Sequence, residues 1–449
     1  MSTIVDAPET RPSAQTLAGW HPLTRIAFRF SFVYFGLYCL LFAQILIAFV
    51  GPLADLLPRD AVIWQMRFAE PVTGWVGRNI FGVDTVLHLN GSGDQSAIWV
   101  MIGTALLIAV LAAGIWTALD RRRTEYRTLN AWFLVVIRWC LGGQMLWYAM
   151  TKVFPNQMPL PSLTALLTPY GNMGPLEVLW GQVGSSPVYE ILLGIAEATA
   201  GLLLFVPRTA TAGALLSALC LAQIWILNMT FDVPVKIHSF TLLLMSLLLL
   251  APQARRLANV LVLQRPSDPV TQPPLSRSPQ VNRIVVAVGV LVGLWVTAGR
   301  VMVGVEDYGA YGNGAPTPPL YGIWNVAEFE VDGAVHPPLL TDTERWRRLV
   351  FDRAKANAYQ RMDDSFVPVQ AQVDTEAHTL TLSKLPESRD AVPPLLAKFT
   401  YEQPAKDRLV LRGDIEGRPA RLTLDYKDPN SFPQRSRGFH WTQEAPDSH

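Results

Sequence analysis

Ionisable side chains inside apolar stretches are the first feature of this chain that can do chemistry. The stretch LNAWFLVVIRWCLGGQMLWYAMTK (129–152) carries Arg138 and Lys152, and YEILLGIAEATAGLLLF (189–205) carries Glu190 and Glu197. A charge in hydrocarbon is costly, so such residues pair with one another or line a functional path. Either stretch is long enough to be a membrane helix.

Helical spacing places these charges on shared faces. Arg138 and Lys152 are 14 residues apart and Glu190 and Glu197 are seven apart, so each pair lies near one helix face. We expect Arg138 to pair with Glu197, either as a bond that locks two helices or as part of a site for binding or proton movement. Gly142 and Gly143 would let a second helix approach closely.

A second polar group opens the segment DVPVKIHSF (232–240), where Pro234 would end or redirect the chain. We expect several residues to gather at the outer end of a helical bundle: Lys152, Asp94, Asn228, Asp232, Lys236, His238 and Glu190. A carboxylate, an amine and an imidazole there could tune one another's pKa. The alternatives are that Lys152 snorkels to the interface, that His238 packs in the core, and that Asp232 and Lys236 fix a loop.

Quinone chemistry fits this group best, because a lipid-soluble ring can reach polar residues at the mouth of a bundle. Lys152 would be the acid or base, His238 its partner, and Glu197 with Arg138 the pair that shapes the pocket. Asn228, Asp232, Lys236 and Asp94 would contribute polar contacts, and Lys236 would help to keep Lys152 neutral.

Several other functions lack support in the sequence. No His/Cys cluster suggests a metal, a haem would need more histidines in the apolar stretches, and no Gly-rich phosphate loop or nucleophile elbow occurs. Cys39, Cys140 and Cys220 stand singly in apolar runs. The net charge of +1 and the absence of a basic cluster outside the predicted membrane flanks argue against nucleic-acid binding.

Hydropathy divides the chain into a membrane part and a water-soluble part. Half of the 449 residues are hydrophobic and 16% are charged, against about 25% charged in a typical soluble domain. We expect a cytoplasmic tail (1–23) rather than a cleaved signal, a transmembrane helical domain (24–304), a linker (305–319) and an extracytoplasmic β-domain (320–449). Seven spans are predicted near 26–50, 97–119, 130–152, 188–206, 209–229, 235–251 and 282–304.

Basic loops predict the orientation. DRRRTEYR (120–127), Pro207-Arg208 and QARR (253–256) fall on one side if the N-terminus is cytoplasmic, which places the protein in the cytoplasmic membrane with its C-terminal domain outside. The outer segment 59–82 has aromatic residues at near-helical spacing, as in a helix lying in the interface. From 320 the period changes to two, which predicts roughly eight short antiparallel strands in a barrel or sandwich.

Several segments resemble the DoxX family of membrane proteins, in particular its long bacterial subgroup with an extra C-terminal domain. They are YAMTKVFPNQMPLPS, PYGNMGPLEVLWGQVGSSPVYEILLGIAEATAGLLLFVPRTATAGALL, ILNMTFDVPVKIHSFTLLLMSLLLLAP, GSGD before the second span, RMDD (361–364) and RGFHW (437–441). The resemblance runs from about 24 to 441. It implies a multi-pass helical core, and the family name is tied to a subunit of a quinone oxidoreductase.

The helical core is more loosely similar to the membrane part of vitamin K-dependent γ-carboxylases. That similarity implies a lysine near the outer end of a span that deprotonates a quinol, a position that Lys152 would occupy. This chain is much shorter and lacks an evident glutamate-binding region, so carboxylation itself is not carried over.

Two hypotheses follow from the sequence. The first is a quinone- or quinol-linked membrane protein acting at the outer face. The second is a non-enzymatic membrane scaffold whose β-domain binds a periplasmic partner or a lipid. GIWNV (322–326) resembles the Gly-x-Trp opening of lipocalin-like barrels, although Trp324 is better explained as a packing residue on the barrel floor.

Overall fold

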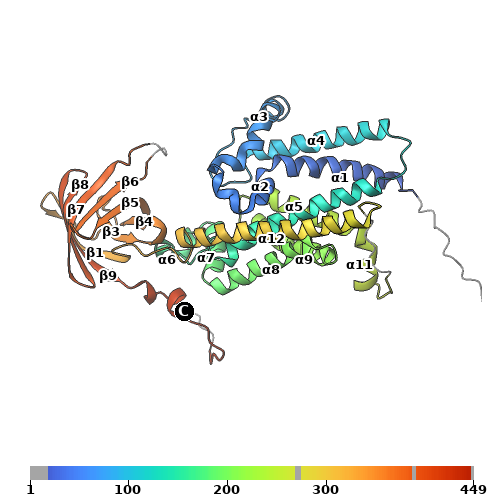
Figure 1. Cartoon of the computed structure of the whole chain (residues 1–449). Helices are drawn as coiled ribbons and strands as arrows, with labels where there is room; N and C mark the ends of the chain where they lie inside the picture. Colours follow the sequence, from blue (N-terminus) through green and yellow to red (C-terminus); the bar gives the residue numbers. More distant parts are fainter. Residues whose placement is uncertain (1–18, 268–274, 387–390, 446–449) are drawn as a thin grey trace, which may run out of the picture.

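The computed structural model describes residues 19–267, 275–386 and 391–445. The predicted N-terminal tail therefore lies mostly outside the described residues. Within them the chain forms a helical bundle followed by a β-barrel, and the barrel stands at one end of the bundle's long axis (Figure 1). Long apolar runs give the helices, and alternating apolar residues give the strands.

Seven helices in the described part are long and apolar enough to cross a membrane, as the sequence predicts. They are α1 (Pro22–Leu41), α4 (Ser96–Leu119), α5 (Arg127–Val153), α8 (Pro187–Phe205), α9 (Ala210–Thr230), α10 (Lys236–Leu250) with its continuation to Leu261, and α12 (Pro279–Ala310). That continuation consists of η5 (Ala251–Gln253) and α11 (Ala254–Leu261). Helix α5 is the most deeply buried of the seven, so it forms the centre of the bundle.

Shorter elements connect these helices. The segment 59–82 is helical, as expected, and consists of η2 (Arg59–Ile63), α3 (Trp64–Val76) and η3 (Gly77–Phe81). Between α5 and α8 lie α6 (Leu163–Leu167), η4 (Tyr170–Asn172) and α7 (Pro175–Gly184). These two connections lie on the same side of the bundle as the barrel (Figure 1).

The first predicted span, 26–50, is wrong in its second half. Helix α1 ends at Leu41, Phe42 is extended (φ −83°, ψ 92°), and the chain continues in α2 (Ala43–Ile47) and η1 (Ala48–Leu56). After the break, η1 turns onto α12: a side chain at Gly299 would lie 2.2 Å from the backbone of Gly51. Unbroken hydropathy does not reveal a break that tertiary packing imposes.

Helices α5 and α8 touch through glycines. A Cβ on Gly201 would lie 3.1 Å from the Gly142 carbonyl, and one on Gly194 would lie 2.8 Å from the Ala149 carbonyl. The predicted close approach at Gly142 is therefore confirmed, and α8 supplies the partner helix. Small residues allow such contact between membrane helices. As a result the segment of α8 between Gly194 and Gly201 lies directly against α5.

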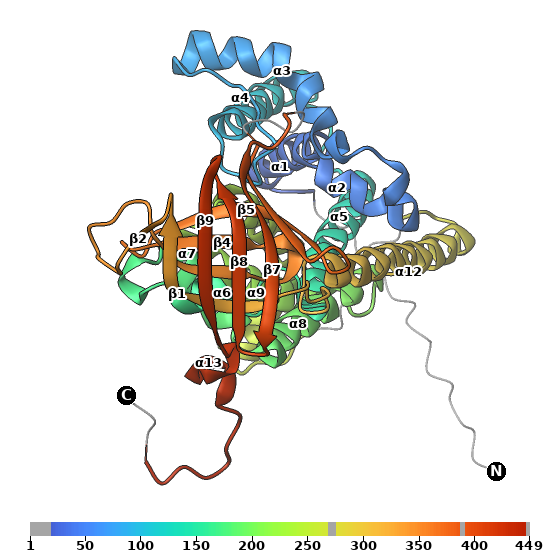
Figure 2. The ribbon, with the colours of Figure 1, turned by 90° about the vertical axis from the view of Figure 1, so that its left-hand side faces the viewer.

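The C-terminal domain is a closed antiparallel barrel of eight strands (Figure 2). They are β1 (Gly322–Val331), β3 (Trp346–Phe351), β4 (Asn357–Arg361), β5 (Phe366–Asp374), β6 (Thr379–Lys384), β7 (Leu395–Ala405), β8 (Arg408–Ile415) and β9 (Arg418–Lys427). Pairing of β1 with β9 closes it, and β2 (Ala334–Val335) extends the β1 edge. Three short elements complete the domain: η6 (Arg353–Lys355), η7 (Pro429–Ser431) and α13 (Pro433–Ser436).

Large side chains fill the barrel. Trp324, Phe329, Phe351 and Phe399 are each no more than 2% exposed and belong to one apolar cluster. The indole N–H of Trp324 donates to the Leu320 carbonyl at 2.9 Å. The packing interpretation of Trp324 is thus confirmed, and the interior is a core like that of other small barrels.

Short helix α6 holds the barrel against the bundle. Leu163 packs on Ile323 and Val350 of the barrel in a separate buried cluster. Its N–H donates to the Asp352 carboxylate at 2.6 Å, and Arg435 donates to the Pro161 carbonyl at 2.9 Å. Burial raises the pKa of Asp352, and the N–H groups of Leu163 and Arg353 oppose that rise.

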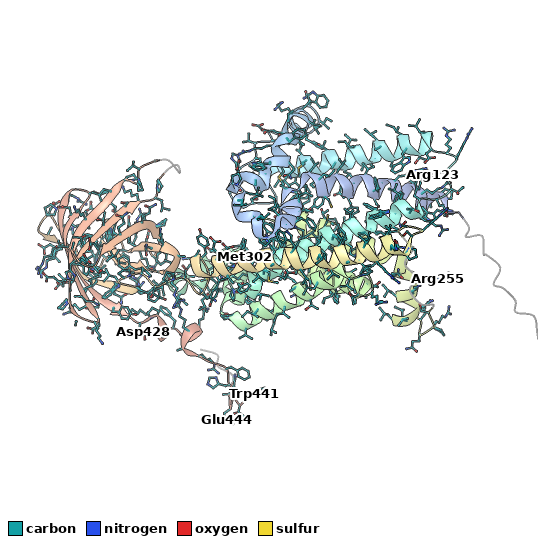
Figure 3. The ribbon with its side chains drawn as sticks, viewed as in Figure 1. Arg123, Arg255, Met302, Asp428, Trp441 and Glu444 are labelled. Atoms are coloured by element: carbon teal, nitrogen blue, oxygen red, sulfur yellow. The ribbon has the colours of Figure 1, made fainter. Side chains whose placement is uncertain are left out.

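The basic loops lie at the other end of the molecule. Arg123, between α4 and α5, and Arg255, in α11, are both at the bundle end opposite to the barrel, whereas Asp428 lies with the barrel (Figure 3). The loops that the sequence assigns to one side of a membrane therefore meet at one end of the fold.

Replacing Asp352 with Ala should loosen the barrel from the bundle. The buried Leu163 N–H and the part-buried Arg353 N–H would lose their acceptor, and leaving a buried donor without a partner costs about 1–3 kcal/mol. We expect faster proteolysis of the connector 311–320 in the full-length protein. Asp352→Asn should have a smaller effect, because one acceptor remains.

The matched control is Asp374→Ala, because Asp374 accepts N–H groups of an exposed turn within the barrel. Equal cleavage rates in the Asp352→Ala and Asp374→Ala proteins would contradict this account of docking.

Candidate functional site

A buried ion pair joins the two helices that the glycines bring together. The Lys152 Nζ of α5 lies 2.9 Å from the Glu197 carboxylate of α8, and the two residues are 6% and 3% exposed. Gly194 and Gly201 flank Glu197 by three and four residues, so both contact points are on its side of α8. The close helix packing therefore sets the position of the pair.

The predicted partnership of Arg138 with Glu197 is wrong. Lys152 reaches Glu197 instead, because Arg138 lies 14 residues away along α5, about 21 Å at 1.5 Å per residue. The snorkelling alternative for Lys152 is also excluded, since its amine is buried among protein atoms.

Tyr148 connects this pair to His238. Tyr148 is one turn before Lys152 on α5, and the Lys152 Nζ lies 5.9 Å from the centre of its ring. On α10, the His238 ring centre is also 5.9 Å from that of Tyr148. Lys152 and His238 thus share one neighbour, although no hydrogen bond joins them directly.

His238 has one occupied and one open nitrogen. Its Nδ1 lies 2.5 Å from the Tyr38 hydroxyl, and its ring stacks on Phe42 with centroids 4.4 Å apart. Its Nε2 is buried and has no partner among the described residues. The break in α1 at Phe42 is what lets that ring lie flat on the histidine.

Two glutamines extend the polar network from the same break. Gln44 in α2 donates to the Tyr148 hydroxyl at 3.0 Å, and Gln144 in α5 donates to the Gln44 carbonyl at 3.1 Å. A connected set of polar groups, Glu197, Lys152, Tyr148, His238, Tyr38 and Gln44, therefore crosses the barrel-side half of the bundle; we call it the inner polar cluster. Glu190 lies outside it and accepts the Met158 N–H at 3.0 Å.

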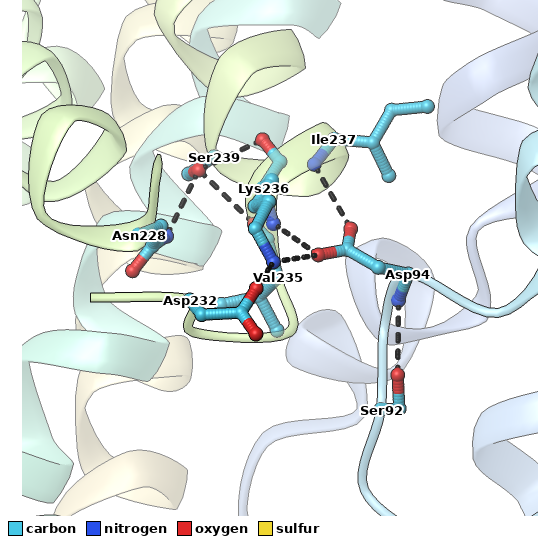
Figure 4. Close-up of polar contacts among 8 residues, drawn as sticks. All are labelled: Ser92, Asp94, Asn228, Asp232, Val235, Lys236, Ile237 and Ser239. Atoms are coloured by element: carbon cyan, nitrogen blue, oxygen red, sulfur yellow. Dashed lines mark hydrogen bonds and ion pairs between the residues drawn. The ribbon is translucent and has the colours of Figure 1, made fainter. Parts of the chain in front are cut away.

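Asp94 and Lys236 belong to a different group with a structural role. Asp94 accepts the N–H groups of Lys236 at 2.9 Å and Ile237 at 3.1 Å, the first turn of α10 (Figure 4). Helix α10 has no cap from its own Val235, so Asp94 caps it from a distant loop. The GSGD motif supplies this cap, and the Gly93 N–H adds a bond to the Pro234 carbonyl at 2.7 Å.

The remaining predicted residues support the same turn. Lys236 lies 2.8 Å from Asp232 and 3.6 Å from Asp94, so two carboxylates balance its charge. Asn228 donates to the Ser239 hydroxyl at 3.0 Å (Figure 4). The sequence-predicted residues therefore separate into the inner polar cluster, the group around the α10 cap, and two residues outside both, Glu190 and Arg138.

A Lys–Glu pair in such a place can hold a mobile proton. Ammonium and carboxylate can exchange one proton to become amine and carboxylic acid, and the low dielectric narrows the difference between these states. No group of three or more His, Cys, Asp or Glu residues suited to a metal occurs in the described ranges. The chemistry that the cluster offers is proton transfer and hydrogen bonding.

Tyr148, Tyr38 and Gln44 are missed by sequence reasoning. Tyr148 carries a usable signal, because it lies four residues before Lys152 on the same face of α5. Tyr38 and Gln44 carry no such sequence signal, since a tyrosine or a glutamine in an apolar run is interpreted as a packing residue unless the helix break is known.

Comparison with known proteins leaves the family open. No family model matches the chain, and no solved structure matches it. An uncharacterized protein, YwoB of Bacillus subtilis (strain 168), is 35% identical over 83 residues, which are 18% of this chain and 54% of YwoB. The chain thus spans about half the length of this curated relative.

Asp94→Ala should destabilise the bundle. Two N–H groups at the start of α10 would lose their acceptor, and loss of a helix cap costs about 0.5–2 kcal/mol. We expect a lower midpoint of thermal unfolding for the purified protein in detergent.

Asp232→Asn is the matched control, because Asp232 also contacts Lys236 but its side chain is 82% exposed. Asparagine tolerates the left-handed backbone at this position (φ 53°). An exposed ion pair contributes about 0–1 kcal/mol. If both variants unfold at the wild-type midpoint, the cap from Asp94 does not stabilise the bundle.

Proposed function

We propose that this protein binds a quinol in the membrane and removes a proton from it with the Lys152–Glu197 pair. Two observations carry the proposal: both charges are buried, and His238, whose Nε2 is open, shares the neighbour Tyr148 with Lys152. Structural ion pairs also occur in membrane bundles, but a buried imidazole nitrogen without a partner favours a ligand that supplies one. A quinol hydroxyl and a quinone carbonyl are both suitable partners.

The proton transfer balances within the pair. The Lys152 ammonium passes its proton to the Glu197 carboxylate, and the free amine then accepts the proton of the quinol hydroxyl. The products are a quinol anion, a Lys152 ammonium and a neutral Glu197. His238 would hold the second oxygen of the ring through Nε2, while the Tyr38 hydroxyl orients the imidazole through Nδ1.

Access from the lipid suits this substrate. The inner polar cluster lies in the barrel-side half of the bundle, and a lipid-soluble ring can enter between helices without crossing water. We place this half at the outer face of the cytoplasmic membrane, because the basic loops lie at the opposite end (Figure 3). The resemblance to DoxX proteins, and more loosely to quinol-deprotonating carboxylases, points to the same substrate class.

A membrane scaffold is the second candidate. The barrel interior is filled by side chains, which disfavours a lipid inside it. Outside it, β2 and the segment that follows expose three apolar side chains, Val335, Leu339 and Leu340, which are 70%, 55% and 73% exposed. Such a patch suits a periplasmic protein partner. The scaffold candidate would be favoured if the purified protein binds no quinol.

Lys152→Met should abolish the effect of the protein on a bound quinol. Under anaerobic conditions, the ultraviolet spectrum of menadiol reports its ionisation, and we expect wild-type protein to lower the apparent pKa of the bound menadiol. Lys152→Met and Glu197→Gln should remove that shift, because either change takes away the proton acceptor.

Lys236→Met is the matched control, since it removes a lysine at the same end of the bundle and leaves the backbone cap of α10 in place. It should retain the wild-type shift. No menadiol binding by folded wild-type protein, or an unchanged shift in Lys152→Met, would contradict the proposal.

A further inference from the structure

Arg138 lies in a cavity at the end of the bundle that faces away from the barrel. The cavity has a volume of about 410 Å³ and is bounded by α5, the start of α9, the end of α10 and the start of α12. Arg138, Asn130, Ala131, Leu134 and Val135 line it from α5. These positions repeat at three, four and seven residues, so one face of α5 forms the wall.

The guanidinium of Arg138 has no counterion among the residues that the structure describes. Arg138 is 7% exposed, its Nε is buried without a hydrogen-bond partner, and it forms no ion pair with any residue in the described ranges. A buried cation is costly unless an anion or several acceptors satisfy it. It lies 11 residues after the first residue of α5, about 16 Å along the helix axis, so it is well inside the bundle and not at the helix end.

A second feature of the cavity also favours an anion. Helix α9 begins at Ala210, and Ala210 and Thr211 line the cavity. This 21-residue helix has no side-chain cap at its first turn. The N-terminus of a helix carries partial positive charge, and in α9 the Ala210 N–H itself donates to the Pro207 carbonyl at 3.4 Å. Arg138 and this helix end therefore present two positive groups to one space.

The rest of the wall is apolar. Leu134 and Val135 of α5, Leu249 of α10, and Val285 and Val286 of α12 line the cavity together with the positive groups. Val286 is 40% exposed in the absence of a bilayer, so the wall of the cavity reaches the outer surface of the bundle. A ligand that satisfies both surfaces has an anionic head and a hydrocarbon tail.

We infer that this cavity binds an anionic amphiphile, whose carboxylate or phosphate pairs with Arg138 and the start of α9. The site is separate from the inner polar cluster, because Arg138 and Lys152 lie 14 residues apart on α5 and no residue of that cluster lines the cavity. The inference does not depend on quinol binding. A fatty acid and an anionic phospholipid share the required chemistry.

The test uses purified full-length protein in nonionic detergent with radiolabelled oleate as the probe. Wild-type protein should bind oleate saturably, and Arg138→Gln should weaken binding at least tenfold. Arg138→Lys, which keeps the charge, should bind with intermediate affinity. Arg122→Gln should match wild type, because Arg122 is an exposed arginine in the α4–α5 loop and does not line the cavity.

Competition identifies the head group and its source. Oleate and dioleoylphosphatidylglycerol should displace the probe, and whichever acts at the lower concentration is the better ligand. Oleyl alcohol, which has the same chain and no charge, should not. Displacement by oleyl alcohol as effective as by oleate would overturn the inference.

A second variant keeps the test decisive if Arg138→Gln fails to fold. Val286→Trp leaves the arginine in place and fills the apolar wall at the bundle surface, so it should also weaken oleate binding. Absence of saturable binding to wild-type protein, or wild-type affinity in a folded Arg138→Gln or Val286→Trp protein, would overturn the inference.

Discussion

The ion pair between Lys152 and Glu197 places the strongest physical constraint on the helical bundle. Desolvating two charges costs several kcal/mol per ion, and at a separation of 2.9 Å their attraction offsets that cost only if neither moves away. Helices α5 and α8 meet at Gly142, Gly194 and Gly201, where a side chain would clash. Replacing one member of such a pair leaves an uncompensated charge and costs about 3–5 kcal/mol.

The surroundings of the pair follow from that contact. Tyr148 precedes Lys152 by one turn, and the break at Phe42 brings Gln44 to its hydroxyl and the ring of Phe42 to His238. The cap from Asp94 fixes the first turn of α10, from which His238 projects. Residues from four distant segments thus hold one imidazole and one amine around a single tyrosine. That degree of positioning is typical of a site that must present groups in one geometry.

The sequence predicts the elements far better than the contacts. Seven long apolar runs and a period-two region lead to the seven helices and the barrel, because length and periodicity are local properties. The partner of Glu197 cannot be read from local sequence. Arg138 and Lys152 both lie on a suitable face of α5, and the position of α8 along the axis of α5 decides which of them Glu197 meets. The break at Phe42 is not local either, since it accompanies the packing of η1 on α12 and of the Phe42 ring on His238. The sequence shows Asp94 as a charged residue just before a predicted span. Its role as a cap, however, depends on the first turn of α10, 142 residues further along the chain.

We propose that Glu197 gains a proton when a quinol binds. Infrared difference spectroscopy of the anaerobic protein, with and without menadiol, measures this directly through the carbonyl stretch of a protonated carboxylic acid. We predict that this band appears on binding in wild-type protein and is absent in Glu197→Gln. Menadiol binding without the band, or the same band in Glu197→Gln, would contradict it.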